Sequence, residues 1–196
     1  MLKKSIMFAA AALVLTACGG NTDKTEQKAS KPESRETSGT ASEKDAAKSA
    51  TATFINADGK EIGTAKLTEA DNGVRVKVEA SQLPPGNHGF HFHEKGSCTA
   101  PNFESAGGHF NPEQAEHGIE NPKGPHAGDL PNIEVGESGA VKFEALAQLV
   151  TLKKGQPNSL LREGGTALVI HADPDDYKSQ PAGNSGKRIA CGEIKE

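Results

Sequence analysis

The residues of this chain best suited to chemistry are its seven histidines. His91 and His93 lie in segment 89–94, with one residue between them. If this segment is a strand, both side chains point to the same face, because side chains alternate along a strand. The pair can then bind one metal ion, although two exposed histidines are the default interpretation of an H-x-H pair taken alone.

A second group of possible ligands lies in segment 96–133, which shows no clear strand or helix pattern. Its members are His109, His117, His126 and Asp129. Three nitrogen ligands and one oxygen ligand suit a closed, tetrahedral zinc site, which would also give this long segment a fixed shape. His171 is less informative, because a single histidine at the end of an apolar run (167–170) is more often structural than a ligand.

Short alternating segments predict that β-strands position these side chains. Residues 74–80 alternate between apolar and charged side chains, the pattern of a half-buried strand. Further strands are expected at 51–57, 60–69, 166–171 and 187–194, and around Val141 and Phe143. Hairpin turns are expected at 57–59 and 71–73, and the 22 Gly and 11 Pro favour a protein with many turns. No window has a convincing helical period, so the sequence predicts an all-β sandwich or barrel.

The composition of the first residues is typical of a targeting segment. Lys3 and Lys4 precede an apolar run at 6–15, which is far shorter than the ~20 residues that span a bilayer. This pattern predicts a signal peptide at 1–17. Residues 15–19 read Leu-Thr-Ala-Cys-Gly and resemble a bacterial lipobox, so Cys18 is expected to be lipidated, with acyl chains such as palmitate. An ordinary signal peptide with a chance cysteine is the alternative.

Residues 18–50 are expected to be the lipidated N-terminus and a disordered tether. Positions 19–50 hold six basic and six acidic residues and no aromatic residue, Val, Ile, Leu or Met. Such a segment cannot bury enough apolar surface to offset its ordering entropy. The folded domain is then expected at 51–196. The expected localisation is extracytoplasmic, lipid-anchored to the cell membrane at the cell surface or in the periplasm.

The charge of the chain argues against a nucleic-acid partner. The formal net charge is −4, and the segment 51–196, with 14 basic and 20 acidic residues, carries −6. The chain has no Trp and a single Tyr, so few side chains can stack on bases. Any anionic ligand must therefore be attracted by a local concentration of positive charge.

Five motifs occur in a fixed order along the chain: GFHFHEKGSC, AGGHFNP, GPHAGDLPN, TALVIHADPDD and GNSGKRIACGEI. Over residues 51–196 the chain closely resembles the copper/zinc superoxide dismutases, in particular the lipoprotein forms of bacteria. This resemblance implies a Greek-key β-sandwich or barrel, immunoglobulin-like, with long metal-binding loops. It also implies an oxidoreductase that converts superoxide to oxygen and hydrogen peroxide and protects the cell surface. Copper would cycle between two oxidation states, whereas zinc would stay structural.

The resemblance assigns a metal to each possible ligand, with one histidine shared by both ions. The implied copper ligands are His91, His93, His109 and His171. The implied zinc ligands are His109, His117, His126 and Asp129. The shared His109 is also given a catalytic role, because it can leave reduced copper, take up a proton and pass it on.

Other residues receive supporting roles from the same resemblance. Asp175 resembles the carboxylate that links a ligand of each metal, and Arg188 resembles the arginine that guides and holds superoxide over copper. Cys98 and Cys191 resemble the pair that ties the long loop to the last strand. This pairing agrees with the cysteine count, because three Cys less the lipidated one leave two for one disulfide outside the cytosol. His88 matches no ligand and is predicted to be structural.

Several alternatives stay open. Segment 177–182 is short beside the animal enzymes, so the residues that steer substrate have no clear counterparts, and Lys178 and Lys187 are only candidates. A surface lipoprotein that buffers copper or zinc would use the same ligands, although it would need neither Arg188 nor Asp175. A structural domain held together by zinc would not need the copper ligands. The sequence is compatible with both a homodimer and a monomer.

Overall fold

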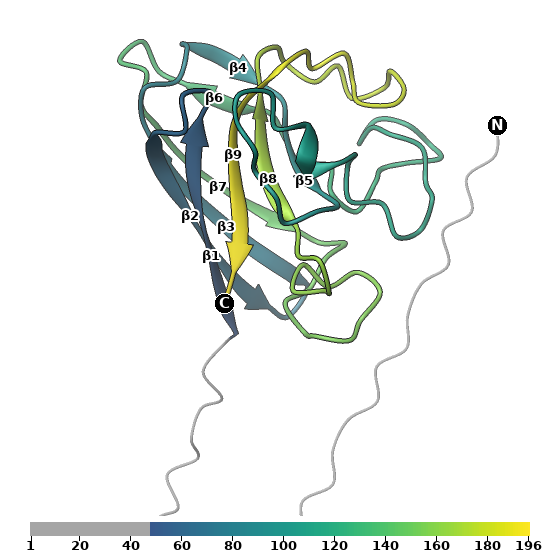
Figure 1. Ribbon diagram of the computed structural model, residues 1–196. Helices are drawn as coiled ribbons and strands as arrows, with labels where there is room; N and C mark the ends of the chain where they lie inside the picture. Colours follow the sequence, from purple (N-terminus) through teal and green to yellow (C-terminus); the bar gives the residue numbers. More distant parts are fainter. Residues whose placement is uncertain (1–47) are drawn as a thin grey trace, which may run out of the picture. The chain divides into compact units, whose positions relative to one another are not determined.

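The computed structural model describes residues 48–196, so the predicted signal peptide, Cys18 and nearly all of the predicted tether lie outside the described residues. Within the described range the regular elements are all β-strands except for one 3-10 turn, as predicted, and long loops connect them (Figure 1). The elements are β1 Ser49–Asn56, β2 Glu61–Ala70, β3 Gly73–Ala80, β4 Gly86–His88, β5 Phe90–His93, the 3-10 turn η1 Glu104–Ala106, β6 Ile133–Val135, β7 Val141–Ala147, β8 Ala167–His171 and β9 Arg188–Lys195.

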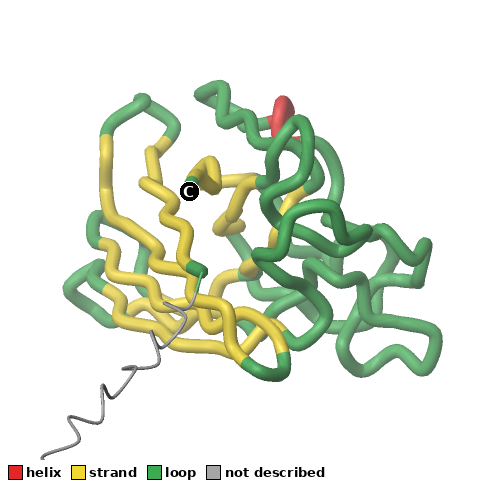
Figure 2. The backbone as a smooth tube through the Cα atoms, turned by 90° about the horizontal axis from the view of Figure 1, so that it is seen from below, coloured by secondary structure: helices red, strands yellow, loops and turns green. Residues whose placement is uncertain are grey.

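The strands form one large antiparallel sheet and one small one. The large sheet has seven strands in the order β5-β8-β9-β1-β2-β3-β7, and β4 pairs with β6 in the second sheet. The large sheet curls round a single main core, and the strands gather on one side of the molecule while the long loops gather on the other (Figure 2). This confirms the predicted all-β sandwich or barrel with long loops.

The alternating segments form strands because one face of each is buried. In β3, Val74, Val76 and Val78 are buried, whereas Arg75 and Lys77 are exposed. Burying a side chain of this size stabilises the fold by about 1.5–3 kcal/mol. The turn between β2 and β3 consists of residues 71–72, since Ala70 pairs with Gly73, as the hairpin signal predicted.

The two strands β4 and β6 were not predicted. Each has three residues, too few to show an alternating pattern. Strand β6 begins at Ile133, the last residue of the segment that was predicted to be irregular. Their pairing is antiparallel, with His88 opposite Ile133.

The long segment between β5 and β6 is fixed to β5 by its backbone. Phe92 N donates to Gly128 O at 2.9 Å, and its carbonyl accepts from Phe110 N at 2.8 Å. Gly128 N donates in turn to Phe110 O at 2.8 Å, so the two parts of the loop also bond to each other. These contacts bring His109 and Asp129 next to β5.

The predicted disulfide between Cys98 and Cys191 is present. It joins the loop after β5 to strand β9, across a sequence separation of 93. Arg188 begins the same strand and donates from Nη1 to the carbonyl of Phe103, at 2.6 Å. The disulfide therefore ties to β9 the same loop whose Phe103 carbonyl accepts a hydrogen bond from Arg188.

Reduction of the disulfide is expected to lower the free energy of unfolding by roughly 4–5 kcal/mol, because a long closed loop loses much entropy when it is cross-linked. The dismutation that the resemblance implies should slow as well, since the loop beside Arg188 loses its covalent tie. Thermal unfolding, and the rate of that reaction, with and without a reductant measure both effects. Equal melting temperatures and rates, once thiol titration has shown Cys98 and Cys191 to be free, would contradict the assigned role.

Candidate metal centre

Four histidines from separate parts of the chain meet at one end of the large sheet. His91 and His93 come from β5, His171 ends β8, and His109 comes from the loop after β5. One ring nitrogen from each lies within 4.8 Å of those of the others. We call this group the four-histidine cluster. The structure thus brings together all four residues predicted to bind copper, including His171, which spacing alone had not marked as a ligand.

A second cluster lies next to the first and is built from the loop alone. It consists of His109, His117, His126 and Asp129, whose ligand atoms also lie within 4.8 Å of one another. We call this group the mixed cluster. These are the four residues predicted to bind zinc, and His109 belongs to both clusters.

The four-histidine cluster has ring nitrogens that need a partner. These are His91 Nδ1, His93 Nε2, His109 Nε2 and His171 Nε2, which are buried and have no hydrogen-bond partner within residues 48–196. A buried polar atom left unpaired costs about 1–3 kcal/mol. Burial lowers the pKa of His93 well below its usual value and that of His171 to about 3, so both rings are neutral and offer lone pairs. The cluster therefore fits a metal that prefers imidazole, such as copper.

The mixed cluster has the spacing of a tetrahedral zinc site. His109 Nδ1 lies 2.9 Å from Asp129 Oδ1, and His126 Nδ1 lies 3.4 Å from His109 Nδ1 and 3.3 Å from Asp129 Oδ1. Ligand atoms placed about 2.0–2.1 Å from a tetrahedral zinc are roughly 3.3 Å apart. His117 Nδ1 lies 3.1 Å from the other carboxylate oxygen, Oδ2. The three histidine nitrogens and the carboxylate of Asp129 therefore form a ligand set that suits zinc.

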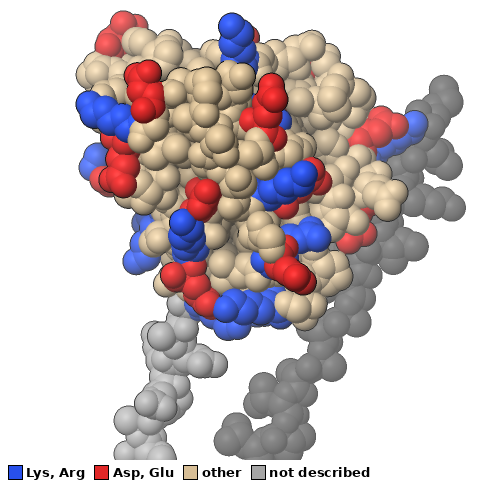
Figure 3. Space-filling view, viewed as in Figure 1, with Lys and Arg blue, Asp and Glu red and all other residues tan. Residues whose placement is uncertain are grey.

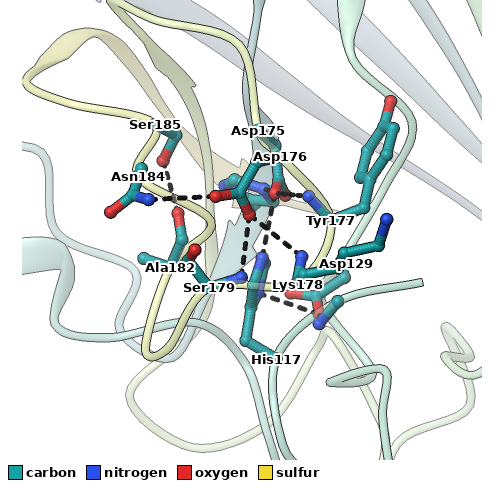
Figure 4. A network of polar contacts seen from close by, with 12 residues as sticks. His117, Asp129, Asp175, Asp176, Tyr177, Lys178, Ser179, Ala182, Asn184 and Ser185 are labelled. Carbon is teal, nitrogen blue, oxygen red and sulfur yellow. Dashed lines mark hydrogen bonds and ion pairs between the residues drawn. The ribbon is translucent and has the colours of Figure 1, made fainter. Parts of the chain in front are cut away.

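Asp175 connects the two clusters, as the resemblance predicted. Its Oδ2 accepts from His91 Nε2 at 2.7 Å. Its Oδ1 accepts from His117 Nε2 at 3.0 Å, as Figure 4 shows. Burial disfavours the charge of this carboxylate, but the two histidine contacts outweigh burial and hold its pKa well below the usual range. For His117, burial is likewise outweighed by Asp129 and Asp175, which raise its pKa to about 9. Asp175 therefore fixes one imidazole of each cluster.

Two residues that support Asp175 were not predicted. Asn132 clamps its backbone: Asp175 N donates to Asn132 Oδ1 at 2.8 Å, and Asn132 Nδ2 donates to Asp175 O at 2.9 Å. Gly183 packs so closely that a Cβ there would lie 1.7 Å from Asp175 Oδ1. Asn132 ends the motif GPHAGDLPN, so the sequence carries a signal for it beside the ligands His126 and Asp129.

Arg188 lies beside the four-histidine cluster and is held by the disulfide-linked loop. Its Nη2 donates to Gly107 O at 2.6 Å, and the same carbonyl accepts from His93 Nδ1 at 2.9 Å. With the Nη1 bond to Phe103, two of its five N–H donors are used. Arg188 also lines a cleft of ≈ 740 Å³ together with Lys187, Asp58 and other residues. The guanidinium, which stays protonated, thus lines this cleft and shares the Gly107 carbonyl with His93 of the four-histidine cluster.

The two lysines considered for steering differ in their surroundings. Lys178 Nζ lies 2.7 Å from Glu120 Oε2, so its charge is paired. Lys187 lines the same cleft as Arg188. On the face seen in Figure 3, basic and acidic side chains are interspersed, so attraction of an anion there depends on local charge. No helix within residues 48–196 is long and apolar enough to cross a membrane.

Comparison with known proteins identifies the family. A family model described as copper/zinc superoxide dismutase matches residues 61–194. A superoxide dismutase [Cu-Zn] of Aquifex aeolicus is 57% identical over 145 residues, which cover 74% of this chain and 86% of that protein. The crystal structure of a SOD-like protein from Bacillus subtilis superposes with a TM-score of 0.70 at 48% identity, covering 72% of this chain and 95% of that one.

A fourth comparison extends the likeness to a more distant enzyme. The Cu/Zn superoxide dismutase from Brucella abortus superposes with a TM-score of 0.63 at 32% identity. The match covers 76% of this chain and 100% of that one. The Greek-key sandwich or barrel of this family is thereby confirmed, and copper and zinc are the metals of the family. The matched segment contains both clusters, Asp175, Arg188 and the disulfide. The chain therefore belongs to the copper/zinc superoxide dismutase family of oxidoreductases.

Proposed function

We propose that this protein dismutates superoxide at the two joined clusters, with copper held by the four-histidine cluster and zinc by the mixed cluster. The observation that carries the proposal is the position of His109, whose Nε2 belongs to the first cluster and whose Nδ1 belongs to the second. An imidazole binds two ions in this way once it has lost its ring proton, because each nitrogen then offers a lone pair.

The reaction converts two superoxide anions and two protons to oxygen and hydrogen peroxide. Copper supplies the one-electron chemistry when bound, and zinc, which keeps one oxidation state, supplies structure. The chain itself must fix the ligands, hold the anion and deliver protons. Asp175 performs the first task, because it anchors His91 and His117 from one carboxylate.

Two side chains serve the substrate directly in this proposal. Arg188 attracts the superoxide anion and donates a hydrogen bond to it from an N–H that the loop carbonyls leave free. His109 Nε2 is the atom at which the chain holds a proton for the departing peroxide. His109 is buried, with 4% of its side chain exposed, so this proton is shielded from bulk water.

Metal analysis and an activity assay on the purified full chain test this proposal. One copper and one zinc per chain are expected, together with superoxide dismutation that cyanide abolishes. A protein that only buffers metals would bind both ions without accelerating dismutation. Full metal occupancy without activity would therefore contradict the proposed function and favour the buffering alternative.

We further propose that the protein acts outside the cytoplasm, attached to the cell membrane through a lipid on Cys18, and protects the cell surface from superoxide. The lipobox-like sequence at 15–19 supports the anchor. The disulfide between Cys98 and Cys191 supports the compartment, because such bonds persist in oxidising surroundings.

Cys18→Ser is expected to abolish lipidation, so the protein is released or stays unprocessed. A single acyl chain binds membranes only marginally, whereas two or more give stable anchoring. Fractionation of cells and mass spectrometry of the mature N-terminus measure the effect. A mature Cys18→Ser protein that still sediments with membranes would contradict the proposed anchor.

A further inference from the structure

The segment between β8 and β9 carries a side chain, Gln180, that holds the backbone of His117. His117 is fully buried and lies in the loop after β5, outside any strand. Its N–H donates to Gln180 Oε1 at 2.8 Å, and its carbonyl accepts from Gln180 Nε2 at 2.9 Å. One amide thus pairs with both backbone polar groups of a residue in the mixed cluster, across a sequence separation of 63.

The Gln180 amide is itself held in one orientation. Its Nε2 also donates to Lys178 O, at 3.1 Å, within the same segment. A glutamine amide has two N–H donors and one oxygen, and here each of these groups has a partner. The oxygen must face the N–H of His117, because the nitrogen faces two carbonyls that only accept.

Few other groups hold the His117 backbone. Within residues 48–196, Gln180 Oε1 is the single acceptor of its N–H, and its carbonyl has one other donor, Asn121 Nδ2 at 3.0 Å. The next residue, Gly118, lies directly against the same segment, since a Cβ there would be 2.0 Å from Tyr177 O. The backbone at 117–118 is therefore fitted closely to segment 177–180.

The imidazole of His117 is held from the same side. Its Nε2 lies 3.0 Å from Asp175 Oδ1, as Figure 4 shows. Its Nδ1 faces the mixed cluster, 3.1 Å from Asp129 Oδ2. Asp175 thus fixes one end of the ring, and Gln180 fixes the backbone from which the ring projects. Together these contacts set where Nδ1 lies.

We infer that Gln180 is a positioning residue for the metal centre: by holding the His117 backbone, it fixes the place at which His117 Nδ1 meets zinc. This inference rests on the proposed function, since it takes His117 as a zinc ligand. Partners that orient a ligand from outside the coordination sphere typically change metal affinity by 10–100-fold when they are lost. Segment 177–182, which shows no clear counterpart of the steering residues, thereby has a role in holding zinc.

Gln180→Met tests the inference, because methionine is close to glutamine in length and volume but lacks the amide N–H donors and oxygen. Ser185→Ala is the control within the same segment. It removes the hydrogen bond from Ser185 Oγ to Ala182 O, 2.8 Å long, which involves no metal ligand (Figure 4). A role limited to keeping the segment ordered predicts that a bound metal keeps its wild-type geometry in both variants.

The readouts are the dissociation constant of Zn²⁺ and the visible absorption spectrum of Co²⁺ bound to saturation in place of zinc, which reports ligand geometry. Both are measured on the full chain with colourless Cu⁺ in the four-histidine cluster. We expect Gln180→Met to weaken zinc binding roughly tenfold or more and to alter the cobalt spectrum. Ser185→Ala should keep both close to wild type. Equal changes in the two variants, or a wild-type zinc affinity or cobalt spectrum in Gln180→Met, would overturn the inference.

Two further variants keep the test decisive. If Gln180→Met does not fold, Gln180→Asn replaces it, because its amide is one methylene too short to reach both backbone groups of His117, and the same changes are expected. His117→Ala tests the proposed function separately. Zinc binding that His117→Ala leaves unchanged would remove His117 as a ligand, and the inference with it. Zinc binding that is lost in His117→Ala but is wild-type in Gln180→Met would overturn the inference alone.

Discussion

His109→Ala is expected to deplete both metals at once and to lower the dismutation rate by more than about a hundredfold. The substitution removes Nε2 from the four-histidine cluster and Nδ1 from the mixed cluster. Loss of a residue that merely supports a ligand costs roughly 10–100-fold in affinity or activity, so loss of a shared ligand should cost more. Copper and zinc per chain after dialysis, and the dismutation rate, measure the effect.

Single-cluster variants provide the matched controls. His91→Ala should mainly reduce copper, and His126→Ala should mainly reduce zinc, since each side chain belongs to one cluster only. The shared role of His109 would be wrong if His109→Ala retained zinc at the wild-type level while His117→Ala lost it.

Arg188→Glu is expected to lower the dismutation rate at low salt by about 10–10³-fold, the range over which local charge changes association rates. Arg188→Lys should retain a substantial part of the rate, because it keeps the charge but not the planar fork of donors. Both variants lose the bonds to Phe103 and Gly107, so the comparison between them isolates the sign of the charge. Rates are compared at equal metal content, since lost copper would imitate a lost arginine.

Lys142→Glu is the charge-matched control. Lys142 lies on β7 with 82% of its side chain exposed and pairs with Glu79, away from both clusters, so this change should leave the rate near wild type. The wild-type rate should also fall with rising salt, as the screening length shortens to about 8–10 Å. A fully metallated Arg188→Glu protein that is as fast as wild type at low salt would contradict the steering role.

The main strands were predictable because their alternation is long enough to recognise. Strand β3 reveals itself by Val74, Val76 and Val78, each separated by one charged residue. Strands β4 and β6 could not be recognised, because three residues do not establish a period. These two strands form because they pair with each other, although they lie far apart in the sequence. A local sequence pattern cannot reveal such a pairing.

The ligands of the centre were predictable, but the contacts that orient them were only partly so. Side-chain type and order point to His109 and Asp129, whereas the carbonyl of Gly107, which accepts from both His93 and Arg188, leaves no mark in the sequence. The sequence shows that a histidine stands at position 88. Its contacts, however, are with backbone carbonyls, and these cannot be inferred from the types of neighbouring side chains.

The sharing of His109 between two metals is tested most directly by a crystal structure of the metal-loaded protein, with anomalous diffraction recorded at the copper and zinc absorption edges. We expect one copper bound by His91, His93 and His171 and one zinc bound by His117, His126 and Asp129, with each ring nitrogen of His109 about 2.0–2.1 Å from one of them. A single metal site, or a His109 bound to only one ion, would contradict the account.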